Sequence, residues 1–179
     1  MSDRRAGSAE RGSGLRHSQY MSKDQTKSPA DRDGTDAAAI TLHASCVSLD
    51  GTGILLMGPS GSGKSDLALR LIDKGARLVA DDLTTLVIKS GRLIAGAPER
   101  LAGRLEVRGI GIVTVPAVAH APLELVVRLM PDAEIERLPE AEHEEFLGLS
   151  VRAVQIDPFT ASAVAKVQVA LSGRPIETA

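Results

Sequence analysis

The segment Gly58–Ser65 constrains this chain more than any other, because it matches the pattern G-x-x-x-x-G-K-[ST] at every fixed position. Its residues are Gly58, Pro59, Ser60, Gly61, Ser62, Gly63, Lys64 and Ser65, and Asp66 follows them. The apolar run over 53–57 before it indicates a short buried strand. After it, Leu67 and Leu71 recur at the spacing of one helix face, and Gly75 is the residue type that ends a helix. A strand, a glycine-rich turn and a helix are the context in which this pattern binds phosphate.

The residues of this turn suit a polyphosphate. Glycines let backbone N–H groups turn inward, and the helix N-terminus adds partial positive charge. Lys64 can reach the β- and γ-phosphates, and the Ser65 hydroxyl is a natural ligand of Mg²⁺. A glycine-rich turn without a ligand is the alternative, and the strand and helix on either side argue against it. We predict that residues 58–66 bind a nucleoside triphosphate or a similar polyphosphate.

Composition narrows the class of protein further. The chain has 179 residues, of which 43% are hydrophobic, enough for one domain with a core of its own. Aromatic residues make up only 2%, so the core must be aliphatic, and bases would find almost no side chain on which to stack. The net charge of −2 offers no strong basic field. Nucleic acid is therefore not an expected partner.

Cysteine content and hydropathy bear on the compartment. The single cysteine, Cys46, cannot form an internal disulfide, which suits a reducing environment, and its apolar neighbours indicate a core residue. No apolar run approaches the roughly 18 residues of a membrane span, and the N-terminus lacks the apolar stretch of a secretory signal. We expect no membrane association and a cytoplasmic protein.

The chain divides into a polar tail and one folded domain. Residues 1–38 are rich in Ser, Gly and charged side chains, and such a segment buries too little surface to fold; we expect a disordered tail followed by a domain over 39–175. Strands are expected over 40–49, 77–80, 105–108, 110–113, 123–129 and 151–156, the 123–129 strand with one buried face, and a helix over 161–171 with Thr160 as its candidate cap. Many strands and few helices predict an α/β domain with a mixed sheet.

Asp81 and Asp82 form the second candidate element of the site. They end the strand 77–80 and lie near the loop in sequence, Asp82 coming 18 residues after Lys64. A hydrophobic strand that ends in acidic residues commonly holds Mg²⁺ directly or through water. Two adjacent carboxylates can also divide the work, one serving the metal and the other accepting a proton. A simple strand-ending turn is the alternative, since Asp favours turns.

His43, Glu106 and Arg108 are ambiguous when taken alone. A lone histidine such as His43 is more often structural than catalytic. Glu106 and Arg108 alternate with Leu105 and Val107, a pattern typical of the solvent-facing side of a strand.

Taken together, these pieces resemble a known family, the catalytic domain of the bifunctional HPr kinase/phosphorylase. His43 precedes Lys64 by 21 residues, the loop 58–65 is similar, and so are Leu78-Val79-Ala80-Asp81-Asp82 and Leu105-Glu106-Val107-Arg108-Gly109-Ile110-Gly111-Ile112. The resemblance covers about residues 40 to 115, and the segment 105–112 is its most specific part. It implies a P-loop nucleotide-binding domain of the PEP-carboxykinase-like kind, with a mixed sheet and few helices.

The resemblance also implies an activity and roles for individual residues. A protein of this family would transfer the γ-phosphate of ATP to a serine of HPr, a small phosphocarrier protein, and inorganic phosphate would remove it again as pyrophosphate. His43, Lys64 and Asp82 would be catalytic, with Asp82 exchanging the proton. Ser65 and Glu106 would ligate Mg²⁺, and Asp81 would support the metal or its water. Members form rings of subunits, so a homo-oligomer is one alternative, although a shortened chain need not form one.

This sequence departs from the family at several positions. Only the tail precedes the kinase-like part, where the family carries a regulatory domain. The match around 145–148 places Phe146 where the family has a catalytic arginine, and Arg152 and Arg137 are candidates to replace it. The region 158–166 lacks the family's arginine-rich loop. Two alternatives therefore stay open: a nucleotide-binding sensor that uses the acidic segment 134–145 to contact a partner, and a P-loop kinase of a small molecule.

Overall fold

A computed structural model describes residues 38–98 and 101–173. Within these ranges the elements are β1 (Ala39–Leu42), β2 (Ala44–Leu49), β3 (Thr52–Met57), α1 (Lys64–Asp73), β4 (Arg77–Ala80), β5 (Thr84–Lys89), β6 (Arg92–Gly96), β7 (Arg104–Val107), β8 (Gly111–Thr114), β9 (His120–Leu129), β10 (Glu142–Phe146), β11 (Leu149–Ile156) and α2 (Ala163–Ser172). The expected tail lies almost wholly outside the described residues, and it stays a prediction together with the domain limits. No described helix combines the length and the apolar character needed to cross a membrane.

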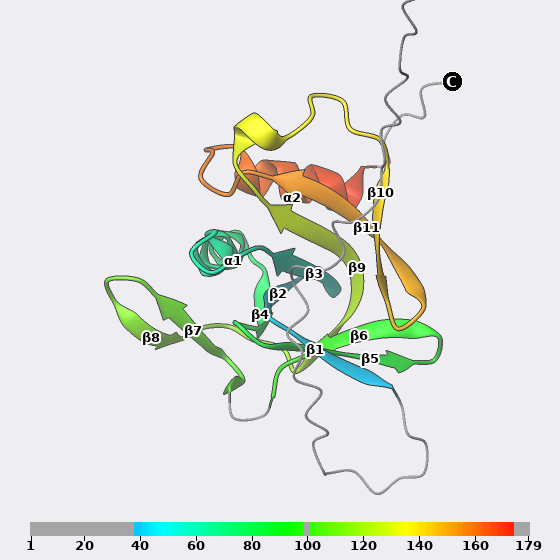
Figure 1. The fold of residues 1–179 in the computed structure, drawn as a ribbon. Coiled ribbons are helices and arrows are strands. Elements are labelled where there is room, and N and C mark those ends of the chain that lie inside the picture. The colour runs from blue at the N-terminus through cyan, green and yellow to red at the C-terminus, as the bar shows by residue number, and fades with distance from the viewer. Residues whose placement is uncertain (1–37, 99–100, 174–179) are drawn as a thin grey trace, which may run out of the picture.

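A strongly curved mixed sheet organises the domain (Figure 1). Its strands run in the order β1-β5-β6-β9-β3-β2-β4, and β11 pairs with both β9 and β10. The pairs β3–β9 and β9–β11 are parallel, whereas the other strand pairs of this sheet are antiparallel. β7 and β8 form a separate antiparallel hairpin. The predicted mixed sheet with few helices is confirmed.

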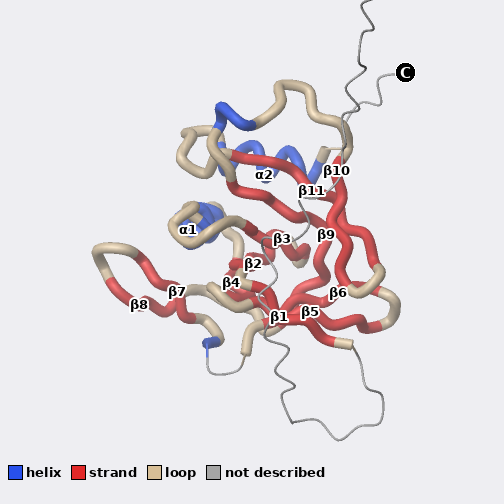
Figure 2. Tube along the Cα trace, viewed as in Figure 1, coloured by secondary structure: helices blue, strands red, loops and turns tan. Residues whose placement is uncertain are grey.

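The two helices lie on one face of the sheet, and strands cover the other (Figure 2). Under the helices, Leu67 and Leu71 of α1 and Val167 of α2 pack with the strand residues Ile54 and Leu56 in one aliphatic cluster. The opposite face is closed by the sheet itself, because its curvature brings β5, β6 and β10 over β2 and β3. This second cluster contains Cys46, and burial raises the pKa of its thiol to about 12, as expected for a core cysteine.

Both faces of the central strands are therefore buried. Residues 53–57 of β3 are all buried, as the apolar run predicts, and β3 leads directly into the phosphate loop. The prediction of one buried face for 123–129 is wrong at Val126, which is fully buried on the face opposite Leu125 and Val127. Alternating apolar residues indicate that one face of a strand is buried. They do not reveal that the curvature of the sheet brings other strands over the opposite face.

The predicted strand 40–49 is two strands, because the chain changes partners at His43. β1 pairs with β5, whereas β2 pairs with β3 and β4. The break is held by the Ala44 N–H, which donates to the Asp82 carbonyl, and by the Thr84 hydroxyl, which donates to the Ala44 carbonyl. His43 thus lies at a bend next to the Asp81–Asp82 turn.

The C-terminal helix also begins differently from the prediction. Ser162 precedes the first helical residue of α2, and the Thr160 hydroxyl donates instead to the carbonyl of Asp157. Thr160 therefore stabilises the turn before the helix rather than capping the helix.

Candidate functional site

The phosphate loop connects the buried end of β3 to the first turn of α1. Gly61 and Gly63 have φ values of +79° and +90°, in the left-handed region that favours glycine. Gly58 is needed for a different reason, since a Cβ there would lie 2.5 Å from the Ser62 hydroxyl oxygen. The predicted strand–turn–helix is present, and its shape depends on these glycines.

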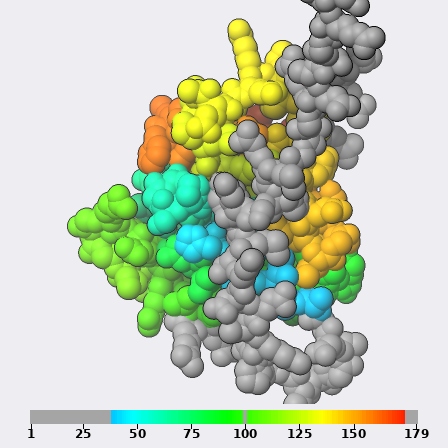
Figure 3. Space-filling view, in the orientation of Figure 1, coloured from blue at the N-terminus to red at the C-terminus, as the bar shows by residue number. Residues whose placement is uncertain are grey.

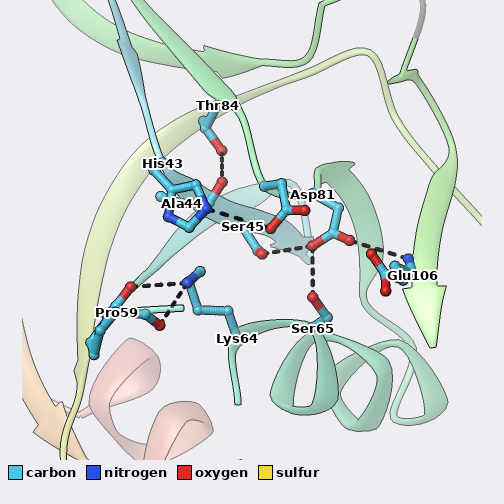
Figure 4. Close-up of polar contacts among 11 residues, drawn as sticks. His43, Ala44, Ser45, Pro59, Lys64, Ser65, Asp81, Thr84 and Glu106 are labelled. Atoms are coloured by element: carbon cyan, nitrogen blue, oxygen red, sulfur yellow. Dashed lines mark hydrogen bonds and ion pairs between the residues drawn. The ribbon is translucent and has the colours of Figure 1, made fainter. Parts of the chain in front are cut away.

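Lys64 is held inside the loop by backbone carbonyls. Its ammonium donates to the carbonyls of Gly58 at 2.9 Å and Pro59 at 3.0 Å (Figure 4). Burial lowers the pKa of this ammonium, and the negative charges of Asp82 and Asp81 offset part of that effect. These described hydrogen bonds of the ammonium are to neutral oxygens, so its positive charge is available for a phosphate.

Asp81 ties three segments of the site together. It is 7% exposed, and its Oδ1 accepts hydrogen bonds from the Ser45 hydroxyl at 2.7 Å and the Ser65 hydroxyl at 3.1 Å. Its Oδ2 accepts from the backbone N–H of Glu106 at 3.2 Å. β2, α1 and β7 are thereby joined at one carboxylate, as Figure 4 shows.

Asp82 adopts a backbone conformation unusual for a residue with a side chain. Its φ is +60°, a left-handed value that aspartate tolerates better than most residues. The turn is closed by the Leu83 N–H, which donates to the Asp81 carbonyl at 2.7 Å. As a result the two neighbouring carboxylates diverge: that of Asp81 is buried, and that of Asp82 is exposed and lies 3.9 Å from Nε2 of His43.

These residues line one cavity of about 390 Å³, within the usual size of a ligand pocket. Its lining comprises His43, Ser60, Gly61, Gly63, Lys64, Ser65, Asp66, Leu69, Asp82, Glu106, Val107, Arg108 and Phe159. Gly58, Pro59 and Ser62 complete the turn behind this lining, and Asp81 lies behind Ser65. The structure therefore brings together every residue that the sequence pointed to as catalytic, nucleotide-binding or metal-binding.

The candidates for the family's catalytic arginine lie elsewhere. Phe146 is buried in the core at the end of β10. Arg152 donates to the carbonyls of Ala170 and Gly173 at the end of α2, and Arg137 is exposed and does not line the cavity. Among the described residues, the arginine that lines the cavity is Arg108, which strand alternation alone assigned to a solvent-facing side. Its place in the segment 105–112 was the available signal.

Phe159 is the other lining residue that sequence reasoning missed. It comes from the loop between β11 and α2, far from Gly63 in sequence, and no local pattern relates the two.

The oxygen atoms around Ser65 fit the chemistry of Mg²⁺. The described residues include no cluster of three or more His, Cys, Asp or Glu side chains arranged to hold a metal. Mg²⁺ is commonly held by one or two carboxylates together with substrate phosphates, so a complete protein cage is not required. The Ser65 hydroxyl lies 3.1 Å from the Asp81 carboxylate, and Glu106 lines the same cavity. These hard oxygen donors are the ones that such an ion prefers.

Comparison with known proteins places this arrangement in a family. Residues 35–171 match the family model described as the HPr serine kinase C-terminal domain. The chain belongs to this family. Curated relatives include the HPr kinase/phosphorylases of Cupriavidus metallidurans and Burkholderia lata, each 38% identical over 131 residues, which are 67% of this chain and 41% of the relative. The chain thus spans about two fifths of the length of these relatives.

A solved structure agrees with the family assignment and confirms the fold. The Hpr(Ser) kinase/phosphatase from Coxiella burnetii superimposes with a TM-score of 0.65 at 28% sequence identity. The match covers 75% of this chain and 93% of that one. The curved mixed sheet, with its two helices and phosphate loop, is therefore the C-terminal kinase-domain fold of HPr kinases.

Proposed function

We propose that this chain is an ATP-dependent serine kinase whose acceptor is the phosphocarrier protein HPr or a close relative. The observation that carries the proposal is the pairing of the aspartates with the loop. Asp81 accepts a hydrogen bond from Ser65 at 3.1 Å, while Asp82 lines the same cavity as Lys64 and stays exposed. A phosphate held by the loop would therefore face a carboxylate able to take a proton.

The forward step assigns a task to each group. The acceptor serine oxygen bonds to the γ-phosphorus, the bond from that phosphorus to the bridging oxygen of ADP breaks, and the serine proton passes to the Asp82 carboxylate. Lys64 and the loop amides compensate the charge on the transferred group. His43, at 3.9 Å from Asp82, would orient that carboxylate. Mg²⁺, when held by Ser65, Glu106 and the Asp81 carboxylate behind them, would neutralise charge on the phosphate oxygens.

The same groups would serve the reverse reaction. An oxygen of inorganic phosphate would bond to the phosphorus of phosphoserine, the bond to the serine oxygen would break, and protonated Asp82 would return its proton to that oxygen. The products would be pyrophosphate and the free hydroxyl. Serine and phosphate would occupy one acceptor position in turn, so the cavity would need no second set of catalytic groups.

A phosphotransfer assay with labelled ATP and purified HPr tests the proposal. We expect acid-stable label on HPr, as phosphoserine requires, and release of pyrophosphate when inorganic phosphate is added to the phosphorylated protein. Tight ATP binding without label on any acceptor would instead favour the sensor. Label on a metabolite but not on HPr would favour a small-molecule kinase, and acid-labile label would indicate phosphohistidine.

The variant Asp82→Asn isolates the carboxylate. Asparagine tolerates the left-handed backbone as aspartate does, so the turn should persist. We expect ATP affinity to stay within about twofold while transfer falls roughly 100-fold or more, the scale of a lost general base. Asp50→Asn is the matched control, because Asp50 also has a positive φ, +51°, and does not line the cavity. A collapse of ATP affinity in Asp82→Asn would contradict the assigned role.

A further inference from the structure

Phe159 is an exposed aromatic side chain in a chain that has almost none. The full sequence contains one Tyr, two Phe and no Trp. The other phenylalanine, Phe146, is 7% exposed in the core, whereas Phe159 is 72% exposed. An exposed large apolar side chain is common by itself. This one is distinguished by its position, because it lines the cavity of the phosphate loop.

The loop that carries Phe159 is held against α1. The Phe159 N–H donates to the Asp157 carboxylate at 2.9 Å, and the Arg70 guanidinium of α1 donates to the Pro158 carbonyl. Arg70 is itself paired with Asp66, one turn earlier in the helix. These contacts hold both polar groups of the peptide bond that joins Pro158 to Phe159, so the domain itself fixes the backbone at the ring.

The ring lies directly against the phosphate loop. A Cβ added to Gly63 would be 3.1 Å from Cζ and 3.3 Å from Cε1 of Phe159. Only glycine at position 63 leaves room for this contact as well as for the left-handed turn. The phosphate loop and one edge of the ring thus form neighbouring parts of a single surface.

The catalytic groups lie on the other side of the helix N-terminus. Asp81 accepts a hydrogen bond from the backbone N–H of Glu106 in β7, and Asp82 lines the cavity with Glu106 and Arg108. The loop between β11 and α2 and the hairpin β7–β8 flank α1 on opposite sides (Figure 1). In the space-filling view the same three segments follow one another along one side of the molecule (Figure 3).

A triphosphate bound by the loop therefore has one end near Asp82 and the other free to extend toward Phe159. For transfer, the γ-phosphate has to face Asp82. The nucleoside, at the opposite end of the triphosphate, therefore extends away from Asp82. Phe159 offers a flat apolar surface there, and nucleobases stack on aromatic rings. We propose that Phe159 is the platform on which the base of the bound nucleoside triphosphate stacks. This inference rests on the proposed function only in requiring that the loop binds a nucleoside triphosphate.

Stacking has a consequence for nucleotide preference. Every base presents a π face, and a phenyl ring has no hydrogen-bonding group with which to read the edge of a base. Stacking on Phe159 therefore does not distinguish one base from another. Phe159 should therefore strengthen the binding of ATP and of GTP to a similar extent, and it should contribute nothing to the binding of inorganic tripolyphosphate.

Calorimetric titrations of ATP, GTP and tripolyphosphate into the wild type and Phe159→Ala test this. We expect Phe159→Ala to weaken both nucleotides about 10-fold, within the range measured for aromatic stacking, and to leave tripolyphosphate within about twofold. Phe159→Trp should restore nucleotide affinity. Because the chain has no other tryptophan, its fluorescence should change with ATP and not with tripolyphosphate. Leu138→Ala is the control, since Leu138 is 89% exposed and does not line the cavity.

The outcomes separate this inference from the proposed function. Equal losses for ATP and tripolyphosphate in Phe159→Ala would overturn the platform and show that the ring supports the loop. Unchanged nucleotide affinity in Phe159→Ala would also overturn the platform. The same holds if the only change in this variant is a higher KM for an acceptor protein. A wild-type protein that binds tripolyphosphate and ATP equally well would overturn the platform alone. Binding of neither would overturn the proposed function as well.

Discussion

One polar cluster surrounds Asp81 at the end of β4, and another surrounds Arg128 near the end of β9. In the first, the described donors to Asp81 are two hydroxyl groups and a backbone N–H, all of them neutral. In the second, the Arg128 guanidinium contacts the carboxylates of Glu142 and Glu144, and Gln155 donates to Glu142. The Arg128 cluster joins β9, β10 and β11, and it does not line the cavity.

The two clusters differ in whether their charged groups contact an opposite charge within the domain. In the Arg128 cluster, the arginine and both of its carboxylates contact an opposite charge within the fold. Around Asp81, the nearby ammonium of Lys64 bonds to carbonyls instead of carboxylates, and Asp82 is exposed in the cavity. A buried charge without a hydrogen-bonded counter-charge is costly for stability, and Lys64 is only 5% exposed. Its presence beside the loop indicates a site arranged for a charged ligand, whereas the Arg128 cluster serves the fold.

The largest effect should come from Lys64→Met, which removes the positive charge and keeps most of the stem. We expect transfer to fall roughly 100-fold or more, because a donor aimed at developing charge is lost. The free energy of unfolding should stay within about 1 kcal/mol of the wild type, because a desolvated ammonium opposes folding. Kinetic assays and urea denaturation measure the two quantities. A large loss of stability would show that Lys64 is a structural residue like Arg128.

Arg128→Ala should have the opposite profile. It leaves two partly buried carboxylates without their cation, and we expect a loss of about 1–3 kcal/mol in the free energy of unfolding. ATP affinity should remain within about twofold, because the cluster does not line the cavity. Arg92→Ala is the matched control, since the Arg92–Glu124 pair is more exposed and should contribute at most about 0.5 kcal/mol. Equal losses in the two variants would remove the distinction between the clusters.

The smallest effect is expected for Ser62→Ala in the phosphate loop. The Ser62 hydroxyl oxygen is buried and has no hydrogen-bond partner in the described residues. Removing it should leave the free energy of unfolding unchanged or raise it by up to about 1 kcal/mol. Tripolyphosphate affinity should not change, since the loop would bind phosphate through backbone N–H groups. A marked loss of affinity would mean that this hydroxyl contacts the ligand.

The parts of the site that sequence predicts best are those formed by consecutive residues. The strand before Gly58, the helix after it and the acidic pair at the end of β4 are all found as expected. Each depends on a local pattern: an apolar run, a helical repeat with a glycine after it, and carboxylates where a buried strand ends. The core position of Cys46 follows from its apolar neighbours in the same way.

The errors arise where distant segments meet. The chain bends at His43 because β1 pairs with β5 whereas β2 pairs with β3 and β4, and no local residue reveals that change of partner. Arg152 and Arg137, the candidates to replace the arginine expected at Phe146, do not line the cavity. Arg108 and Phe159 reach the cavity only because a hairpin and a loop pack on either side of α1.

The sequence by itself determined the phosphate loop, since the positive φ angles of its glycines and the chemistry of Lys64 and Ser65 are properties of eight consecutive residues. The many strands and few helices that it predicts also indicated the mixed sheet. Only the tertiary structure decided which other side chains face that loop. Their positions follow from the curvature of the sheet and the packing of α1 against β7 and the β11–α2 loop, and such long-range contacts are set by the burial of surface over the whole domain rather than by any short pattern.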